Sequence, residues 1–532
     1  MGHYDPWITR QETIVASLLS AMSSDSFGKI SPSVYETARL VTLAPWLAGH
    51  TERLRSLVQS QHENGDWGDG DDGYRLVPTL SATEALLAVI RRDRHVDGIA
   101  RDAVSETADR GLRVLFGWLN TDRGISVPDT VAVEILVPAL VSEINTHMDE
   151  LEWHTRPRLA LPDGTDSELL ARLRDTVRQG RALPAKLAHS LEVIGQPLTN
   201  LPWIQPAEGA VGCSPAATAA WLGETAPRDR QSSVGYLTAM QDRHGGPVPV
   251  CGPVPVFERS WVIAALTSAG VRVAIPDQVV DSLHAAFGDL GVAVGPGLPP
   301  DADDTATALY ALAGTARARS PDCLWAYRIG EHFSSFPSER TWSTSTNAHV
   351  LQAIGAHVAR DGIPPTRYLD AISQLARWLC DHQDESGWWT DKWHASPYYA
   401  TAGCSVVLAR HGGTAADDAV RKAVAWVLDT QRADGSWGRW QGTAEETAYA
   451  MRTLLHAGKH QHPVGDAVIR AAARGCVFLL RSEASEHPPL WHDKDLYTPT
   501  RVVQAEVIAA LWLAYTDPRV AALIERDDGS PP

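Results

Sequence analysis

The sequence is poor in cysteine for its length and has no segment that could anchor it in a membrane. Its 532 residues include six cysteines, which lie far apart and form no Cys-x-x-Cys pair. This spacing excludes a disulfide framework and the common zinc-ligand patterns, and it is typical of a reducing cytosol. No run approaches the ~20 apolar residues that a membrane span needs, and no N-terminal stretch resembles a signal peptide. We therefore predict a cytoplasmic protein without a membrane span.

Positive charge and phenylalanine are also scarce. The net charge is −17 and the basic residues form no cluster, which argues against nucleic acid as a partner. Seven phenylalanines stand against 19 tryptophans, and indole is the best aromatic partner for a cation, although it also fills cores. The composition, 44% hydrophobic and 21% charged, is that of a folded protein, and the length predicts two domains.

Alternating strand patterns are rare, and most segments have apolar residues at the three- and four-residue spacing of helices. Examples are "LSATEALLAVIRR" (80–92), "AVEILVPALVSEI" (132–144), "AHVLQAIGAHVAR" (348–360) and "AEVIAALWLAY" (505–515). We therefore predict an all-α fold. The Gly/Pro-rich stretches 245–256 and 291–300 are predicted to be loops that shape a cavity or a domain junction.

A glutamine–glycine–tryptophan turn recurs after apolar helices. Full copies begin at Gln61 ("QHENGDWG"), Gln383 ("QDESGWW") and Gln431 ("QRADGSWG"), and a degraded copy, "QDRHGG", begins at Gln241. Glycine permits the turn, and glutamine and tryptophan can brace it by hydrogen bonding and stacking. The repetition favours helical hairpins arranged around a barrel over isolated helix–turn–helix units.

Three aspartates stand at the start of an apolar helix in "PPDADDTATALYAL" (299–312). Asp301 is a plausible N-cap, and acids are favoured near a helix N-terminus, so capping explains one or two of them. A third acid adds repulsion that capping does not require. In an apolar site, repulsion and desolvation keep a carboxyl protonated near neutral pH, which makes it a proton donor. Magnesium binding is the rival function, but none of the paired aspartates has the DDxxD spacing of cyclases that ionise a diphosphate.

The motif "DADDTA" resembles the DxDD motif of class II terpene cyclases, and the turns resemble their QW repeats. Nine further stretches resemble copalyl-diphosphate-synthase-type enzymes, in that family's order. They are "DWGDGDDGYRLVPTLSATEAL" (66–86), "VAVEILVPAL" (131–140), "LPAKLAHSLEVIG" (183–195), "GCSPAATAAWL" (212–222), "GGPVPVCGPVPVFERSW" (245–261), "STNAHVLQA" (345–353), "WWTDKWHASPYYAT" (388–401), "EETAYA" (445–450) and "LWHDKDLYTP" (490–499). The resemblance implies two α-barrel domains in a βγ architecture, without the class I α domain. It places β at residues 1–30 plus 266–532 and the inserted γ domain at 31–265.

The resemblance also implies the chemistry, which is that of an isomerase (an intramolecular lyase). A linear prenyl diphosphate would be cyclised by protonation of its terminal alkene, and the diphosphate would be kept. Asp303 would be the general acid, with Asp301 and Asp304 tuning it by hydrogen bonds. Asn347 matches the family position whose amide orients the acid's proton. Tryptophans would stabilise the carbocations and exclude water.

The diphosphate requires cations, and three basic residues stand in apolar, aromatic stretches. Lys392, Arg259 and Lys494 are the candidates, and each is about equally well explained as a surface residue that buries only its stem. The family typically requires Mg²⁺, so we expect this ion as a cofactor, although the sequence shows no ligand set for it.

The product is the least determined feature. Plant ent-copalyl diphosphate synthases end the reaction with a histidine–asparagine pair, whose positions correspond here to His189 and Val250. Since the pair is broken, His189 is expected to bind water or simply to pack inside γ. We lean towards farnesyl diphosphate as substrate and drimenyl diphosphate as product. The alternative is geranylgeranyl diphosphate and a copalyl-type product.

Other classes fit the residues less well. Squalene–hopene cyclases are longer and carry more QW repeats, and protein prenyltransferases need a zinc site that this sequence does not supply. A glycoside hydrolase would need two carboxyls on either side of the scissile bond, whereas this acidic cluster is local. A non-catalytic α-barrel scaffold would use the aspartates only as caps. The sequence leaves the oligomeric state open.

Overall fold

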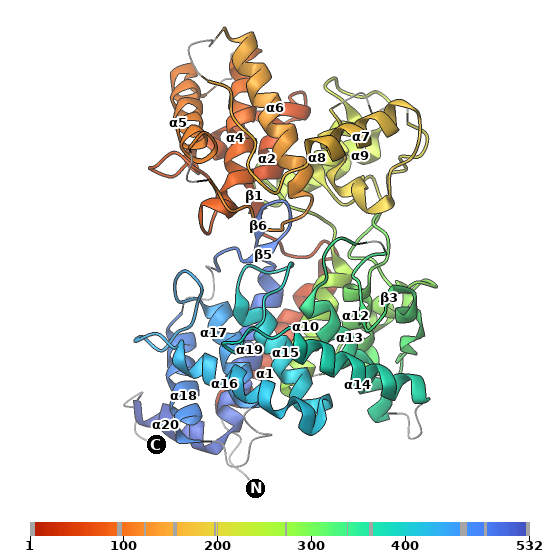
Figure 1. The fold of residues 1–532 in the computed structure, drawn as a ribbon, viewed down its shortest axis with the longest axis vertical. Helices are drawn as coiled ribbons and strands as arrows, with labels where there is room; N and C mark the ends of the chain where they lie inside the picture. Colours follow the sequence, from red (N-terminus) through yellow and green to blue (C-terminus); the bar gives the residue numbers. More distant parts are fainter. Residues whose placement is uncertain are drawn as a thin grey trace.

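The protein is described by a computed structural model that consists of two rings of helices, one above the other (Figure 1). The described residues are 6–527 apart from 93–97, 122–123, 153–156, 196–197, 199–200, 272–273, 338, 361–364, 458–464 and 483–486. The strands found there are two residues long and pair only as small hairpins or bridges. The prediction of an all-α double barrel is confirmed.

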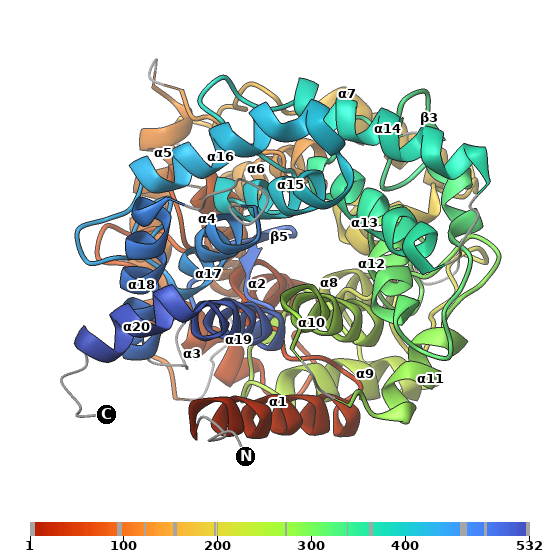
Figure 2. The ribbon, with the colours of Figure 1, turned by 90° about the horizontal axis from the view of Figure 1, so that it is seen from below.

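The lower ring has a closed inner layer in which each helix packs against the next (Figure 2). In ring order its members are α10 (Pro255–Ala269), α12 (Ala302–Ala313), α13 (Thr344–Arg360), α15 (Pro397–His411), α17 (Ala444–Arg452) and α19 (Thr500–Thr516), which returns to α10. An outer layer packs against them, formed by α1 (Pro6–Ser24), α11 (Asp277–Ala285), α14 (Thr366–Asp381), α16 (Asp417–Asp429), α18 (Asp466–Arg481) and α20 (Pro518–Asp527).

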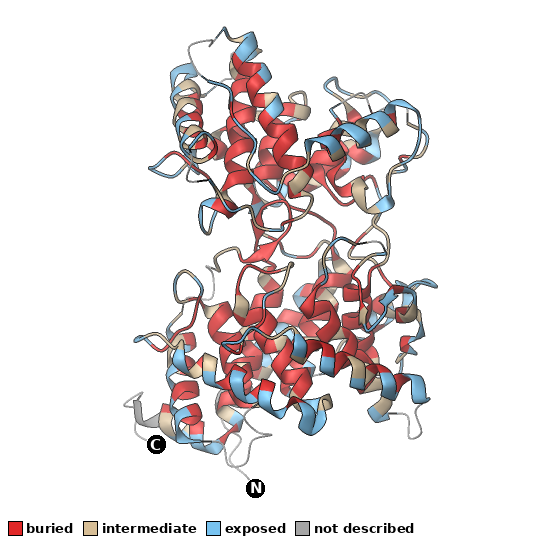
Figure 3. Cartoon of the chain, in the orientation of Figure 1, coloured by how far each residue is buried: buried red, intermediate tan, exposed pale blue. Residues whose placement is uncertain are grey.

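Burial follows these two layers. The inner helices are buried along most of their length, whereas the outer helices expose one face (Figure 3). In α14, for example, Leu375 and Leu379 are buried while Leu369 is exposed. An amphipathic stripe therefore places a helix in the outer layer, and an almost uniformly apolar helix lies in the inner layer.

The upper ring is built in the same way from fewer helices. Its inner layer is α2 (Val34–Leu43), α4 (Asp72–Arg91), α6 (Val133–Glu150), the 3₁₀ segment η1 (Ala185–Ile194) and α8 (Pro215–Leu222), which packs back on α2. Around it lie α3 (His50–Gln59), α5 (Arg101–Leu119), α7 (Ser167–Arg178) and α9 (Gln231–Asp242). The remaining short elements are η2 (Pro321–Tyr327), η3 (Gly413–Ala416), η4 (Thr453–Ala457), β3 (Arg328–Ile329) and β4 (His332–Phe333).

The chain enters and leaves the upper ring at one point. Strand β1 (Pro32–Ser33) pairs antiparallel with β2 (Val248–Pro249), so the upper ring is inserted between α1 and α10 of the lower ring. The predicted boundary at 265/266 is wrong in detail because it cuts α10, which packs on α12 and α19 of the lower ring. The chain returns from the upper ring to the lower ring before Pro255.

A hairpin of β5 (Trp491–His492) and β6 (Leu496–Tyr497) lies between the two rings (Figure 1). Its strands continue into α19 of the lower ring, while β6 also contacts β1. The tip, Asp493–Asp495, is buried. The hairpin therefore ties the rings together from the centre of the molecule.

The repeated glutamine–tryptophan turns fasten neighbouring outer helices to each other. In the turn at Gln383, the side-chain Nε2 donates to the carbonyls of Gly387 (2.9 Å) and Ala419 in α16 (2.8 Å). The indole of Trp389 donates to Leu379 in α14 (2.8 Å). The same bonds recur from Gln61 to Gly65 and Thr107, Trp67 to Leu57, Gln431 to Gly435 and Ala471, and Trp437 to Val427. The predicted bracing by hydrogen bonds is confirmed.

The turn requires glycine at its fifth position. Gly387 has φ +100°, and a Cβ there would lie 2.5 Å from the carbonyl oxygen of Lys422 in the next outer helix. Only glycine combines this backbone conformation with so close an approach.

Two further expectations concern the whole chain. None of the six cysteines forms a disulfide. In the described ranges no single helix is long and apolar enough to cross a membrane; one sharply bent pair, Thr500–Thr516 with Pro518–Ile524, meets the length and composition criteria.

Candidate active site

The three aspartates lie at the N-terminal end of α12, buried at the mouth of the lower ring. Asp301 is the N-cap, and its carboxylate accepts the N–H of Asp304 at 2.8 Å. The backbone N–H of Ala302 donates to Ser335 (2.9 Å), which fixes the start of the helix to the loop before α13. The capping role predicted for Asp301 is confirmed, and it leaves the other two carboxyls free for another purpose.

Burial favours the protonated form of two of these carboxyls. It raises the pKa of Asp301 to about 7 and the pKa of Asp304 well above its ordinary value, and the charges of the neighbouring aspartates add to both shifts. One oxygen of Asp304, Oδ1, is buried without a hydrogen-bond partner. A carboxyl held neutral at pH 7 in a dry site can donate a proton.

Asp303 has a partner on the neighbouring inner helix. Its Oδ1 lies 2.7 Å from Nδ1 of His349 in α13, and the edge of that imidazole meets the ring of Trp261 in α10 at 5.4 Å. A donor on one oxygen of a carboxyl group stabilises its ionised form and leaves the other oxygen available. His349 was missed by the sequence analysis, although it stands two residues after Asn347 in "STNAHV".

Asn347 does not contact Asp303 in the described hydrogen-bond network. Its amide accepts from the N–H of Phe333 (2.8 Å) and donates to the carbonyls of Phe333 (2.9 Å) and Ser343 (2.8 Å). All three bonds are to backbone, and the side chain is fully buried. Asn347 therefore joins β4 to the start of α13, and His349 holds the position beside the acid that was predicted for Asn347.

A continuous series of aromatic rings leads away from the acid. Trp261 packs on Phe257 (4.7 Å between centroids), Phe257 on Trp491 (5.5 Å), and Trp491 on Tyr399 (5.0 Å). These rings come from α10, β5 and α15, and all are buried. Buried aromatic rings supply negative π-faces in surroundings that exclude water, which are the two properties that a carbocation requires.

Two of the three predicted diphosphate ligands, Lys392 and Arg259, bond to groups in different parts of the lower ring. The ammonium of Lys392, in the loop before α15, pairs with Glu339 at 2.6 Å, and both side chains are nearly buried. Arg259 donates to the hydroxyl of Ser282 in the outer helix α11 (2.7 Å), and burial lowers its pKa. Lys392 therefore stands at the mouth of the ring, whereas Arg259 is directed to the outer layer.

The third predicted ligand, Lys494, belongs to a different structure. Its ammonium is completely buried at the tip of the β5–β6 hairpin and bonds Glu36 (2.6 Å), Glu192 (2.8 Å) and the hydroxyl of Ser214 (2.9 Å). Burial lowers its pKa, but the two carboxylates outweigh this effect and raise it. Lys494 is thus a cation that joins the two rings, and the prediction that it faces the diphosphate is corrected.

His189 lies in the same inter-ring network. Its Nδ1 is 2.7 Å from the carbonyl of Gly212, and its Nε2 is 2.9 Å from Oδ1 of Asp493. Both partners are acceptors, so both ring nitrogens must donate. Burial lowers the pKa of His189, but Asp493 outweighs it and the net shift is upward. Val250, the other member of the broken pair, is fully buried in the core of the lower ring. His189 has the structural role that the sequence analysis considered.

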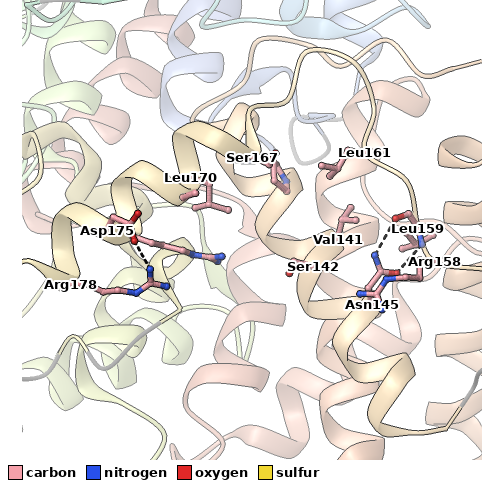
Figure 4. Close-up of a pocket in the computed structure, with 13 residues that line it drawn as sticks. Val141, Ser142, Asn145, Arg158, Leu159, Leu161, Ser167, Leu170, Asp175 and Arg178 are labelled. Carbon is pink, nitrogen blue, oxygen red and sulfur yellow. Dashed lines mark hydrogen bonds and ion pairs between the residues drawn. The ribbon is translucent and has the colours of Figure 1, made fainter.

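A surface pocket of about 490 Å³ lies in the upper ring between α6 and α7 (Figure 4). Its arginines are already engaged: Arg158 pairs with Asp149, Arg174 donates to the carbonyl of Val193, and Arg178 pairs with Asp175. The pocket contains none of the acidic cluster, so we do not place the reaction there.

The described residues contain no group of three or more His, Cys, Asp or Glu that could hold a metal ion. Mg²⁺ bound through phosphate oxygens needs only one or two protein carboxylates. The expected cofactor therefore has no assigned protein site among the described residues.

The mouth of the lower ring thus combines a cluster of buried carboxyls, two of them with raised pKa, with a series of aromatic rings. Comparisons with known proteins identify the family. The squalene–hopene cyclase C-terminal domain family matches residues 342–504. The ent-copalyl diphosphate synthase of Streptomyces sp. (strain KO-3988) is 44% identical over 497 residues, 93% of this chain and 94% of that one. The labda-7,13-dienyl diphosphate synthase of Streptomyces clavuligerus is 39% identical over 518 residues, 93% and 92% of the two chains.

A solved structure extends the agreement to the fold. The ent-copalyl diphosphate synthase from Streptomyces platensis superposes with a TM-score of 0.88 at 44% identity, covering 95% of this chain and 99% of that one. The chain belongs to the bacterial class II terpene cyclases of the copalyl diphosphate synthase type, and it is an isomerase.

Proposed function

We propose that the protein converts geranylgeranyl diphosphate to a bicyclic copalyl-type diphosphate. The support comes from the relatives, whose names specify copalyl and labdadienyl diphosphates. They favour the longer substrate over the lean towards farnesyl and drimenyl diphosphate that the sequence alone suggested. The observation that carries the chemistry is the buried Asp303 carboxyl in contact with His349.

In this mechanism Asp303 protonates the terminal alkene of the substrate. An alkene is a very weak base, so the acid must be positioned beforehand and kept dry. Burial at the start of α12 provides the dryness, and the bond from His349 to Oδ1 fixes the carboxyl and stabilises its charge after transfer. Asp304, which burial keeps protonated, adds no negative charge beside Asp303 before the proton leaves. Asp301, with a pKa of about 7, is ionised in only about half of the molecules at neutral pH.

The aromatic series then guides the cation. Trp261 packs against His349, the partner of Asp303, and Phe257 and Trp491 continue the series from it. Each cyclisation step moves the positive charge along the folded substrate, and a ring that faces the charge stabilises it by about 2 kcal/mol when water is excluded.

The diphosphate is kept throughout, so its charge must be balanced. Inner helices α13, α15 and α17 begin at this mouth, as the contacts of Asp391 with Ser345 and of His394 with Glu445 show. Helix N-termini favour anions, and Lys392 adds a cation in the loop before α15. We assign Lys392 as the diphosphate ligand, with Mg²⁺ accompanying the substrate, in a cytoplasmic enzyme.

The test is incubation with geranylgeranyl or farnesyl diphosphate and Mg²⁺, followed by dephosphorylation and mass analysis. We expect a bicyclic C20 alcohol from the first substrate. Asp303→Ala should lower the rate by more than ~10³-fold, whereas Asp370→Ala, an exposed acid on outer helix α14, should not. A bicyclic C15 product alone would restore the drimenyl alternative, and recovery of both linear alcohols would contradict the proposed function.

A further inference from the structure

A protonation-initiated cyclisation must end with the loss of a proton. The histidine–asparagine pair that ends the reaction in plant ent-copalyl diphosphate synthases is broken in this chain. If the proposed function holds, the last tertiary carbocation loses a proton to an acceptor. His189 cannot accept it, because both of its ring nitrogens already donate, to Gly212 and Asp493. The side chain of Val250 carries no polar atom. Neither member of the broken pair can therefore take the proton, and another group with a free lone pair is needed.

Glu445, at the start of α17, has the required arrangement. Its side chain is completely buried, and three donors converge on Oε1: the indole of Trp491 (2.7 Å), the hydroxyl of Tyr449 (3.0 Å) and Nε2 of His394 (3.2 Å). Nδ1 of His394 accepts the backbone N–H of Ser396 (3.0 Å), so the ring proton is on Nε2 and is donated to Glu445. The carboxylate is thus fixed through one oxygen.

The other oxygen of Glu445, Oε2, is buried and has no hydrogen-bond partner. Burying an unpaired acceptor costs free energy, so an unpaired buried carboxylate oxygen calls for a functional explanation. Aromatic rings surround this carboxyl group: Trp491 and Tyr449 donate to Oε1, and the ring of Tyr399 packs on both of them. A cation brought against these rings would meet Oε2 as a free acceptor in an aromatic environment.

Glu445 also lies at a suitable distance around the ring from the acidic cluster. Helix α12, which carries the acid, packs between α10 and α13, while α17 packs between α15 and α19, so the two helices lie across the ring from each other (Figure 2). Tyr399 lies between them: its pKa is raised by burial and by the charge of Asp303, and its ring packs on Trp491 and Tyr449. Bicyclisation creates the first cation at the protonated end and the last one farther along the substrate, which requires acid and acceptor to be apart.

Within the described part of the chain, two other carboxyl groups have a buried oxygen without a partner, Asp304 and Glu192. Burial holds Asp304 in its protonated form, because its pKa is raised well above the ordinary value. Glu192 pairs with Lys494 in the inter-ring network. Glu445 is the one of the three that is neither a proton donor nor part of an ion pair with a buried lysine.

We propose that Glu445 is the catalytic base that ends the reaction. A C–H bond beside the final carbocation breaks, its electron pair forms the carbon–carbon double bond, and the proton passes to Oε2 of Glu445. The proton returns to solvent when the product leaves. The proposal rests on the proposed function and adds to it the group that fixes the position of the new double bond.

The test is Glu445→Gln, which keeps an oxygen for Trp491, Tyr449 and His394 but places an amide nitrogen at the Oε2 position. The matched control is Glu446→Gln, the next residue of α17. Glu446 is equally buried, but its carboxylate accepts the hydroxyl of Thr443, the N-cap of the helix. Product profiles and rates of substrate consumption are measured for both variants and for wild type. In Glu445→Gln we expect the wild-type product to fall at least 10-fold, replaced by hydroxylated or double-bond-isomeric bicyclic diphosphates, with substrate still consumed.

The other outcomes distinguish failure of the proposed function from failure of the Glu445 assignment. Absence of cyclisation by the wild type contradicts the proposed function itself. If the wild type cyclises and folded Glu445→Gln gives the same product at a similar rate, the assignment of Glu445 is wrong. A folded Glu445→Gln variant that no longer consumes substrate also overturns it, because a terminal base acts after protonation. The same product change in Glu446→Gln would show a general effect of altering α17.

Discussion

Replacing Lys494 by methionine should destabilise the protein severely without acting through substrate binding. The ammonium makes bonds of 2.6, 2.8 and 2.9 Å to Glu36, Glu192 and Ser214, and the two carboxylates are at most 1% exposed. Methionine fills a similar volume but leaves both carboxylates buried without a counter-charge. Removing one partner of a buried ion pair costs about 3–5 kcal/mol, a large part of the 5–15 kcal/mol that typically holds a domain folded.

The measurement is urea unfolding followed by tryptophan fluorescence. Lys422→Met is the matched control, because Lys422 pairs with Asp418 at 3.3 Å on a half-exposed surface and should change stability by less than ~0.5 kcal/mol. Adding Glu36→Gln to Lys494→Met should recover part of the loss, since the amide oxygen can still accept the N–H of Ala216. Stability within ~1 kcal/mol of wild type, combined with a raised KM, would refute this reasoning and return Lys494 to the diphosphate.

Two further predictions concern His349 and Asp495. His349→Leu removes the partner of Oδ1 of Asp303 and should lower kcat about 10- to 100-fold, the value of one charge-assisted hydrogen bond. KM should change little, and His349→Gln should restore part of the loss. A change in KM alone would contradict the positioning role. Burial raises the pKa of Asp495 to about 7 from 3.8. A raised carboxyl pKa means that stability is present below pH 3.8 and is lost as pH rises through 7. Between pH 5 and pH 8 the free energy of unfolding of wild type should therefore fall by up to about 3 kcal/mol more than that of Asp495→Asn. Urea unfolding at each pH measures this difference. Equal losses would show that Asp495 does not titrate in this range.

Local patterns predicted the features that depend on neighbouring residues. The helical spacing identified an all-α fold, because each inner or outer helix carries its own apolar face. Asp301 was predicted as an N-cap and is one, since a cap bonds an N–H three residues away. The turns at Gln61, Gln383 and Gln431 were predicted to be braced because their glutamines and glycines recur at fixed spacing.

Roles that depend on distant partners were predicted less well. Asn347 and His349 are two residues apart on α13, and sequence alone does not show which of them meets α12. The boundary at 265/266 failed because the local pattern does not show which ring α10 belongs to. The Gly/Pro-rich stretch 245–256 was predicted to be a loop, and the crossing lies there, just before α10. Glu445 was visible in "EETAYA", but its free oxygen depends on how three donors from separate segments reach it.

The sequence by itself determined that this chain forms helices in two rings and places a cluster of acids at a helix start. Only the tertiary structure decided what the isolated charges do. Lys494 bonds Glu192, 302 residues away along the chain, and this contact makes it an inter-ring cation instead of a diphosphate ligand. Likewise His189 is made a double donor by Gly212 and Asp493. Whether a buried ionisable group is acid, base or structural tie depends on the partners around it, and the fold, not the local pattern, supplies those partners.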